Sequence, residues 1–185
     1  MTSQQIMQDS RVARVRELKE EVARLNQEIA RTREELEGLR RHFALALLAA
    51  RDGESLAPGG TLLVVDGWNA ILGSERAVER RPGGEWREEL AAKVEEWLAG
   101  HPDDRAWIVF DGPDARGEAR GRLRISYTGG GGEHRADRLV CDYLRMRRYG
   151  GARGRVVVVT GDKDFRAEAE RLGAQTEGVG RWTGR

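Results

Sequence analysis

Aspartates follow three short apolar segments of this sequence. The segments are LLVV at residues 62–65, AWIVF at residues 106–110 and RVVVV at residues 155–159. Asp66 and Asp111 come directly after the first two, and Asp162 comes three residues after the third. Short, uninterrupted apolar runs are typical of strands buried on both faces of a parallel sheet. Ligands of such sheets bind beyond the carboxyl ends of the strands, so we expect these carboxylates to face one common site.

Further polar residues fall near the same strand ends. Asn69 follows the first strand, Asp164 follows the last, and Asp137 falls in the first turn of a helix predicted for residues 134–149. Clustered carboxylates cannot all stay ionised without a cation, and Mg²⁺ prefers oxygen ligands, so the site suits attack of a metal-activated water on a phosphodiester. The predicted metal ligands are Asp66, Asp111, Asp137, Asp162 and Asp164. The helix dipole offers Asp137 an alternative role as a capping residue.

Zinc and thiol chemistry find little support in the sequence. His42, His101 and His134 belong to three separate predicted elements, and the chain has one cysteine, Cys141. These residues do not form the ligand set that a zinc site requires. Cys141 lies inside an amphipathic helix with no candidate base near it in sequence, so we do not expect it to act as a nucleophile.

Charge is unevenly distributed along a chain whose net charge is only +1. Residues 116–155 contain eleven arginines and four acids, a local balance of +7, whereas residues 61–115 are acidic. A basic segment beside an acidic cluster is typical of phosphate binding around a metal site. Alternatively, arginine is simply the preferred cation of this chain, in which lysine occurs only at positions 19, 93 and 163.

The cysteine count and the lengths of the apolar runs indicate where in the cell the protein is expected. A single cysteine excludes an internal disulfide and fits a reducing environment. No run reaches the roughly 18 apolar residues that a membrane span needs, and no apolar signal-peptide core follows the first residues. We therefore expect a soluble, cytoplasmic protein without membrane contact.

Residues 1–50 carry a heptad pattern and are predicted to form a coiled-coil helix. Residues spaced alternately three and four apart are Val15, Leu18, Val22, Leu25, Ile29, Thr32, Leu36, Leu39, Phe43 and Ala46. β-Branched residues at the a positions and leucine at the d positions favour a parallel two-stranded coil, so we predict a homodimer. The alternative is a helix that folds back on its own globular domain.

Residues 51–60 (RDGESLAPGG) are the predicted linker, because glycine and proline break helices. Residues 61–185 are predicted to form one domain. Apolar strands alternate there with amphipathic helices, which indicates an α/β fold with a mostly parallel central sheet flanked by helices. The predicted helices are residues 86–99, 134–149 and 165–172, and the predicted edge strands are residues 123–127 and a last strand near the C-terminus.

Four segments together resemble the YacP-like NYN domain family, which belongs to the wider PIN-like nuclease fold. In chain order they are LLVVDGWNAI, IVFDG, SYTGGGGEHRADRL and VVVTGDKDF. The resemblance covers residues 61–174 and leaves the N-terminal helix outside. It implies a Mg²⁺- or Mn²⁺-dependent endoribonuclease acting on single-stranded RNA. One characterised branch of the family is a ribosome-associated enzyme that cleaves mRNA during translation, so RNA and the ribosome are the implied partners.

The same resemblance implies roles for individual residues. The implied catalytic residues are Asp66 and Asn69 in the first motif, Asp137 in the helix, and Asp162 and Asp164 in the last motif. Asp111 matches the acid that ends the second strand. The candidate RNA-binding residues are Arg116, Arg120, Arg122, Arg124, Arg135 and Arg138. Arg138 and Cys141 occupy positions where the helical motif of the family often carries further acids.

Two other functions remain open on the sequence. One is an RNA-binding or ribosome-docking module that keeps this fold but does not cut. The other is a phosphohydrolase of the haloacid dehalogenase type, suggested by the Gly161-Asp162 pair near the C-terminus. The second is weakened because the Asp-x-Asp nucleophile motif of those enzymes is absent from Asp66-Gly67-Trp68.

Overall fold

The structure is a computed structural model of the chain, and it describes residues 3–73, 84–129 and 134–182. The chain divides into two compact units, Met1–Ala44 and Leu45–Arg185. The glycine-rich sequence TGGGG at residues 128–132 predicts a loop, and most of this segment lies outside the described residues.

Helix α1, Ser3–Ser55, forms the first unit and continues into the second. The apolar residues of the predicted heptad stripe between Val15 and Leu39 each expose between 44% and 66% of their surface. Ion pairs such as Arg16–Glu20 and Arg31–Glu35, each at 3.1 Å, lie along the same helix and stabilise it only modestly. A long helix with an exposed apolar stripe is thus confirmed, whereas the coiled coil stays a prediction. The side chains of the last two stripe positions, 43 and 46, are outside the described residues.

The end of α1 lies within the second unit. The helix continues past Gly53 to Ser55, so the first half of the predicted linker is helical. Leu48 packs against the core of the second unit, and Leu56, just beyond the helix, is a buried member of that core. The apolar end of the helix therefore contacts the globular domain.

The second unit is built on a six-stranded sheet in the order β3-β4-β2-β1-β5-β6. The strands are β1 (Thr61–Asp66), β2 (Arg105–Phe110), β3 (Ala115–Arg120), β4 (Leu123–Thr128), β5 (Arg155–Val159) and β6 (Gln175–Glu177). All neighbouring pairs are parallel except β3 with β4. Strand β1 is central, as predicted, because β2 and β5 pair with its two sides.

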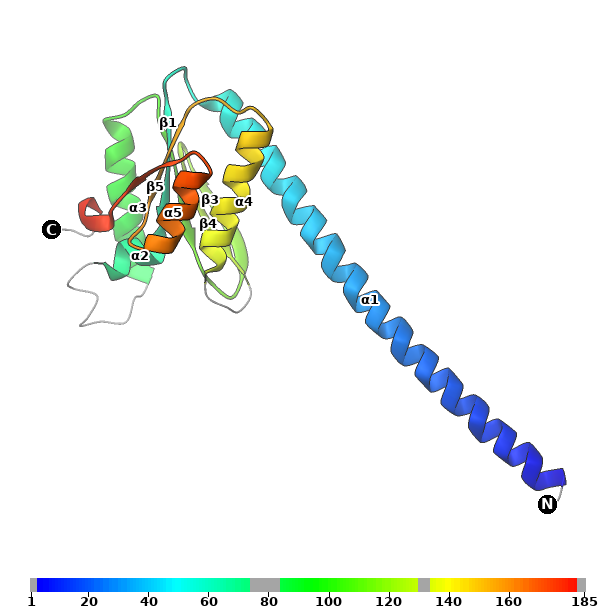
Figure 1. Cartoon of the computed structure of the whole chain (residues 1–185). Helices are drawn as coiled ribbons and strands as arrows, with labels where there is room; N and C mark the ends of the chain where they lie inside the picture. Colours follow the sequence, from blue (N-terminus) through cyan, green and yellow to red (C-terminus); the bar gives the residue numbers. More distant parts are fainter. Residues whose placement is uncertain (1–2, 74–83, 130–133, 183–185) are drawn as a thin grey trace. The chain divides into compact units, whose positions relative to one another are not determined.

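Two hydrophobic cores cover the two faces of the sheet. Leu62 and Val64 of β1 face one core, while Leu63 and Val65 face the other, as the two-residue period of a strand requires. Figure 1 shows helices α4 (Arg135–Tyr149) and α5 (Lys163–Arg171) over one face. Helices α2 (Gly67–Leu72) and α3 (Gly84–Ala99) contribute to the core on the opposite face. The predicted α/β fold with a mostly parallel sheet flanked by helices is therefore confirmed.

One predicted edge of the sheet is wrong. The alternation of apolar and polar residues along β4 predicts an edge strand, but β4 pairs with β2 on one side and β3 on the other. Strand β3, with the sequence ARGEAR, forms the real edge and is exposed over most of its length. A short polar strand gives no apolar signal, which is why the sequence pattern does not predict it. The last edge strand, β6, is confirmed.

Helices α3, α4 and α5 begin and end within about two residues of their predicted bounds, whereas α1 extends to Ser55 and the short helix α2 is not predicted by the sequence pattern. Arg147 of α4 corrects one expectation, because the helical pattern predicts it on the outward face and it is only 4% exposed. Its Nη2 donates to the carbonyl oxygens of Arg153, at 2.5 Å, and Gly154, at 3.3 Å.

No helix in the described part of the chain is both long and apolar enough to cross a bilayer.

Candidate metal centre at the carboxyl end of the sheet

Asp66 ends the central strand and is buried, with only 5% of its surface exposed. It also caps helix α2, because its Oδ1 accepts the backbone N–H of Asn69 at 3.2 Å. Its Oδ2 accepts the Asn69 side-chain amide at 2.6 Å and the Thr160 hydroxyl at 3.1 Å. Burial raises the pKa of Asp66 to about 6, although the hydrogen bonds from Asn69 and Thr160 oppose the shift. The site therefore contains a carboxylate whose charge is costly without a cation.

The chain must pass very close to β2 directly after Asp66. A Cβ atom at Gly67 would overlap the ring of Phe110, so this position needs a glycine for lack of space. Trp68 then donates its Nε1–H to the backbone oxygen of Asp111 at 2.7 Å. These contacts fix the ends of β1 and β2 against each other.

Asp111 ties the start of α4 to the end of β2. Its Oδ1 accepts the backbone N–H of Ala136 at 2.7 Å and the hydroxyl of Thr128 at 3.0 Å. His134, the residue before α4, makes no side-chain capping bond to the helix backbone. The first backbone N–H groups of any helix have no partner within the helix. Asp111 therefore supplies an acceptor for one of these groups in the first turn of α4. By holding this turn, it positions Asp137.

Asp137 lies in that first turn, as predicted, and its side chain is 18% exposed. Its Oδ2 is 3.0 Å from Nδ1 of His134. Burial raises the pKa of Asp137; the contact with His134 opposes this shift, while the negative charges of Asp162 and Asp111 add to it. The carboxylates are thus close enough to influence one another's ionisation.

Asp162 follows β5 and caps helix α5. Its Oδ1 accepts the backbone N–H groups of Asp164, at 2.8 Å, and Phe165, at 3.0 Å. Its own backbone N–H donates to the hydroxyl oxygen of Thr160 at 3.1 Å. Because the same hydroxyl donates to Asp66, the fully buried Thr160 connects two of the predicted site carboxylates.

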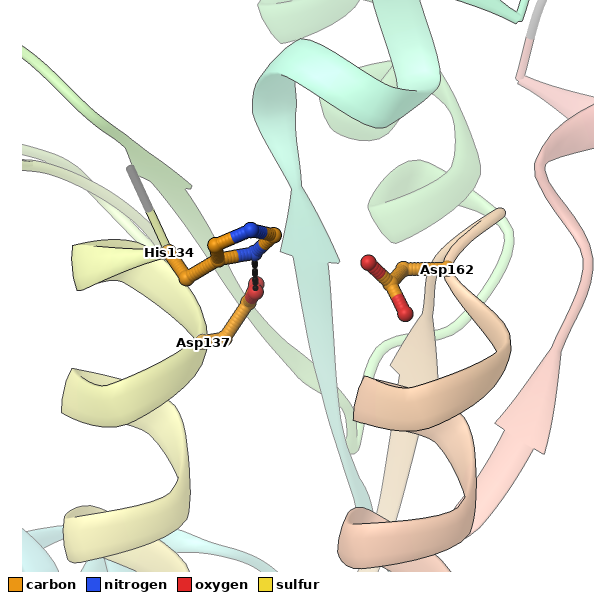
Figure 2. Close-up of side chains that lie close together, drawn as sticks. All are labelled: His134, Asp137 and Asp162. Atoms are coloured by element: carbon orange, nitrogen blue, oxygen red, sulfur yellow. Dashed lines mark hydrogen bonds and ion pairs between the residues drawn. The ribbon is translucent and has the colours of Figure 1, made fainter. Parts of the chain in front are cut away.

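Three side chains come close enough together to hold one metal ion. Potential ligand atoms of His134, Asp137 and Asp162 all lie within 4.8 Å of one another. Figure 2 shows the imidazole and the Asp137 carboxylate, from the start of α4, pointing toward the Asp162 carboxylate at the start of α5. The residues fit a cation because nitrogen and oxygen donors converge there, beside the buried carboxylate of Asp66.

Among the described residues, the remaining predicted ligands do not join this group of three. Asp66 interacts electrostatically with Asp137, and Asp111 is engaged at the start of α4. Asp164 is exposed in the first turn of α5. Asn69 contacts Asp66 through its side-chain amide. The metal and catalytic roles assigned to these four residues stay predictions, as do those assigned to Asp137 and Asp162.

The six candidate RNA-binding arginines divide between the two ends of the sheet. Arg116 pairs in register with Tyr127, near the carboxyl end of β4, and its guanidinium lies 4.2 Å from that ring's centre. Arg135 and Arg138 lie in the first turns of α4, beside Asp137. These three arginines are therefore at the same end of the sheet as the acids.

The other three arginines lie toward the amino end of β4 and have structural partners. Arg120 forms ion pairs with Glu88 and Glu118. Arg122 donates to three carbonyl oxygens at or just after the end of α3, those of Leu98, His101 and Asp104. Arg124 lies 4.5 Å from the centre of the Trp107 ring. The binding of RNA by these three arginines stays a prediction, and their contacts with other groups of the protein do not favour it.

Cys141 is buried in α4, and burial raises the pKa of its thiol to about 11. The thiol is therefore protonated at neutral pH, which agrees with the expectation that it is not a nucleophile. It contributes to the core that covers one face of the sheet.

Two residues of the site are not predicted by the sequence reasoning. His134 looks isolated from the other histidines, although its place three residues before Asp137 allows the two side chains to meet across the first turn of a helix. Its backbone has a φ of 60°, which is uncommon for a residue other than glycine and is frequent at functional sites. Thr160 gives a weaker signal, a lone hydroxyl directly after a buried strand.

Comparison with known proteins supports the fold. No protein-family model and no curated protein matches the chain. The crystal structure of a tryptophan-to-leucine mutant of Rae1 (YacP) from Bacillus subtilis is similar, with a TM-score of 0.51 and 20% identity over 66% of this chain and 72% of that one. The structure of Rae1 (YacP) itself gives a TM-score of 0.48 at 20% identity, covering 64% and 68% of the two chains. The first of these likenesses supports a YacP-like fold for about two thirds of this chain.

The raised pKa of Asp66 predicts how stability depends on pH in metal-free buffer. Between the unfolded value of 3.8 and the folded value of about 6, the folded chain binds more protons than the unfolded chain, so the free energy of unfolding should fall as pH rises. A shift of this size corresponds to about 3 kcal/mol. Urea denaturation at pH 4 and pH 6.5 should show the decline, and Asp66→Asn should reduce it. An equal decline in Asp66→Asn would contradict the assignment of this pH dependence to Asp66. The control is Asp142→Asn, because the carboxylate of Asp142 pairs with Arg145.

Proposed function

We propose that this chain is a metal-dependent endoribonuclease that cleaves single-stranded RNA at the carboxyl end of its sheet. The observation that carries the proposal is the convergence of His134, Asp137 and Asp162 within 4.8 Å, beside the buried carboxylate of Asp66. Acids gathered at strand ends suit a divalent cation, and a divalent cation suits phosphodiester hydrolysis.

His134, Asp137 and Asp162 would hold the cation. When bound, the metal would polarise the phosphoryl group and lower the pKa of a coordinated water. Mg²⁺ favours oxygen ligands, whereas imidazole is a better ligand for later transition metals. The two carboxylates suit Mg²⁺ and Mn²⁺ alike, and of these two only Mn²⁺ is a transition metal, so the histidine makes Mn²⁺ the better candidate. Two carboxylates and one histidine also differ from the cysteine and histidine set of a structural zinc site.

Asp66 would hold and release a proton in this mechanism. Its carboxylate accepts three hydrogen bonds, from the backbone and side chain of Asn69 and from Thr160, which fix its orientation. A carboxylate has about four acceptor positions, so one remains for a water molecule at the site. The carboxylate of Asp66, oriented by these hydrogen bonds, can take a proton from that water.

RNA is the proposed substrate because three of the candidate RNA-binding arginines lie at the same end of the sheet as the acids. Arg116, Arg135 and Arg138 can neutralise phosphates on either side of a cleaved bond. The resemblance to YacP-like NYN domains adds the class of reaction, and it extends the proposal to mRNA in a ribosome-associated setting. The proposed location is the cytoplasm.

A second candidate function is RNA binding without cleavage. It is favoured by the exposed Arg138 and the buried Cys141, which stand where the resemblance leads one to expect further acids. Three close ligands are fewer than a rigid, all-protein metal cage would supply. Because Mg²⁺ and Mn²⁺ sites often rely on water and substrate oxygens for the rest of the shell, we favour catalysis.

Cleavage of labelled single-stranded RNA tests the main proposal. We expect cleavage with Mn²⁺, slower cleavage with Mg²⁺ and none with EDTA. Asp137→Asn and Asp162→Asn should each lower the rate by at least about 100-fold, because a lost ligand weakens the metal site. Asparagine is a good helix cap, so Asp162→Asn removes the charge while leaving α5 capped.

Asp142→Asn is the matched control for this experiment, since it removes a carboxylate from α4 that pairs with Arg145 outside the ligand group. Cleavage that survives EDTA would contradict a metal mechanism. RNA binding without cleavage under every metal condition would favour the second candidate instead.

Salt dependence of RNA affinity tests the arginine assignment. Replacing Arg116, Arg135 and Arg138 together with alanine should flatten the slope of log K against log salt by about 0.7 per lost phosphate contact, or roughly 2 in all. Fluorescence anisotropy with a short RNA in EDTA gives the slope. Arg120→Ala removes a charge from the opposite end of the sheet and should leave the slope unchanged. A flattened slope in Arg120→Ala alone would place the RNA elsewhere.

We further propose that α1 forms a homodimer through its exposed stripe. Burying an apolar side chain such as Leu25 or Ile29 in a partner helix contributes roughly 1.5 to 3 kcal/mol, and the stripe contains at least seven such residues. Light scattering should give a dimer for the full chain and a folded monomer for a chain that begins at Leu45, which keeps Leu48 and Leu56 in the core. A monomeric full-length chain would exclude the dimer.

A further inference from the structure

A second candidate site lies at the amino end of the sheet, away from the acids. A pocket of about 460 Å³ is lined by the last turn of α4, the start of β5 and the end of α5. Figure 1 shows α4 and α5 both ending at the end of the sheet where β5 begins. From Arg155 to Val159, strand β5 spans about 13 Å, so the length of a strand separates this pocket from the carboxylate site.

Arginine dominates the lining of this pocket. Four of its residues are Arg147, Arg148, Arg155 and Arg171, and no acidic residue is among those that line it in the described part of the chain. Helix C-termini attract cations, and two helices end here, so part of this charge has a structural explanation.

The positive charge of the four arginines that line this pocket exceeds what the two helix C-termini would attract. Each helix C-terminus carries about half a negative charge, so two helix ends offset about one positive charge. Arg171 is also paired with Glu168, through Nη2 at 2.6 Å. About two of the four positive charges are left without compensation, and among the described residues no carboxylate pairs with Arg148 or Arg155.

Two of the arginines are held in place before any ligand arrives. Arg147 is buried and donates to the carbonyl oxygens of Arg153 and Gly154, which fixes the loop that forms one wall. Arg155 directs its Nε and Nη2 to the hydroxyl of Thr61, at 3.2 Å and 3.0 Å. Preorganised guanidinium groups bind phosphate with little further loss of side-chain freedom.

We propose that this pocket binds the phosphate group of a nucleotide, either free or within an RNA strand. Guanidinium groups match phosphate oxygens in geometry and charge. The volume falls within the roughly 300 to 1,000 Å³ typical of small-molecule sites. Leu144, Val156 and Leu172 add apolar surface against which a sugar or base can pack, and the Gln175 amide adds a donor and an acceptor.

Calorimetric titration of the full-length protein in EDTA tests this proposal without any cleavage reaction. The probes are pyrophosphate, adenosine 5′-monophosphate, adenosine, and a short single-stranded RNA with either a 5′-phosphate or a 5′-hydroxyl end. We expect the phosphate-bearing probes to bind and adenosine not to bind. Tighter binding of the 5′-phosphorylated RNA would identify a terminal phosphate as the ligand, whereas equal binding of the two RNAs would identify the backbone.

Two variants connect binding to the pocket. Arg148→Ala removes an exposed arginine, and Gln175→Glu adds a negative charge at nearly constant shape; each should weaken binding of adenosine 5′-monophosphate roughly tenfold. Arg153→Ala is the matched control, because it removes the same charge from the adjacent loop while its side chain does not line the pocket. Thermal unfolding of each variant checks that the fold is intact.

Three outcomes would overturn the proposal: adenosine binding as tightly as its monophosphate, Arg148→Ala binding like the unaltered chain, or Arg153→Ala weakening binding as much as Arg148→Ala. The result is independent of the metal site. A chain that binds nucleotide here but never cuts RNA would support this pocket and contradict the proposed nuclease, and the reverse result is equally distinguishable.

Discussion

The carboxylate of Asp66, held in the interior at the end of the central strand, is the interaction on which the rest of the site depends. Burial disfavours its charge, and the donors from Asn69 and Thr160 offset part of that cost. Those donors come from the first turn of α2 and from the residue after β5. The chain segments after β1 and after β5 must therefore approach each other closely. Gly67 allows this approach because no side chain fits between it and Phe110.

The same carboxylates also serve as helix caps, so folding and assembly of the site are coupled. Asp66 caps α2, Asp162 caps α5, and Asp111 accepts a backbone donor at the start of α4. Each acid is thereby fixed by backbone groups rather than by long, mobile side chains. The positive end of each helix dipole also favours the ionised form. A cation that joins His134, Asp137 and Asp162 would link the starts of α4 and α5, which belong to different parts of the sequence.

Sequence patterns predict the features that depend on strong local signals. Buried parallel strands are recognisable as apolar runs, which is why β1, β2 and β5 and the acids after them are placed correctly. Features that depend on tertiary contacts have no such signal. Strand β3 is polar because it lies at an exposed edge, and Arg147 looks like a surface residue until the loop that it holds is seen. His134 has a left-handed backbone directly before α4, and its ring contacts Asp137, a contact that no sequence pattern shows. Arg122 resembles a phosphate ligand in sequence, yet its three carbonyl partners become visible only when the end of α3 is in place.

The polarity of a parallel α/β sheet explains why acids and arginines gather at opposite ends of this domain. All strands that pair with β1 run in one direction, so the helices that follow them start at the carboxyl end and finish at the amino end. Helix starts attract anions and helix ends attract cations, which favours acidic caps at one end and arginines at the other. At the acidic end there are more carboxylates than helix capping requires. Other acids already accept the backbone N–H groups at the helix starts, and Asp137 adds a further negative charge beside them. At the basic end the arginines of the pocket likewise exceed what two helix ends require. Charge in excess of what the helices need points to a ligand, and by that criterion this sheet presents two candidate sites, one proposed for a cation and one proposed for a phosphate.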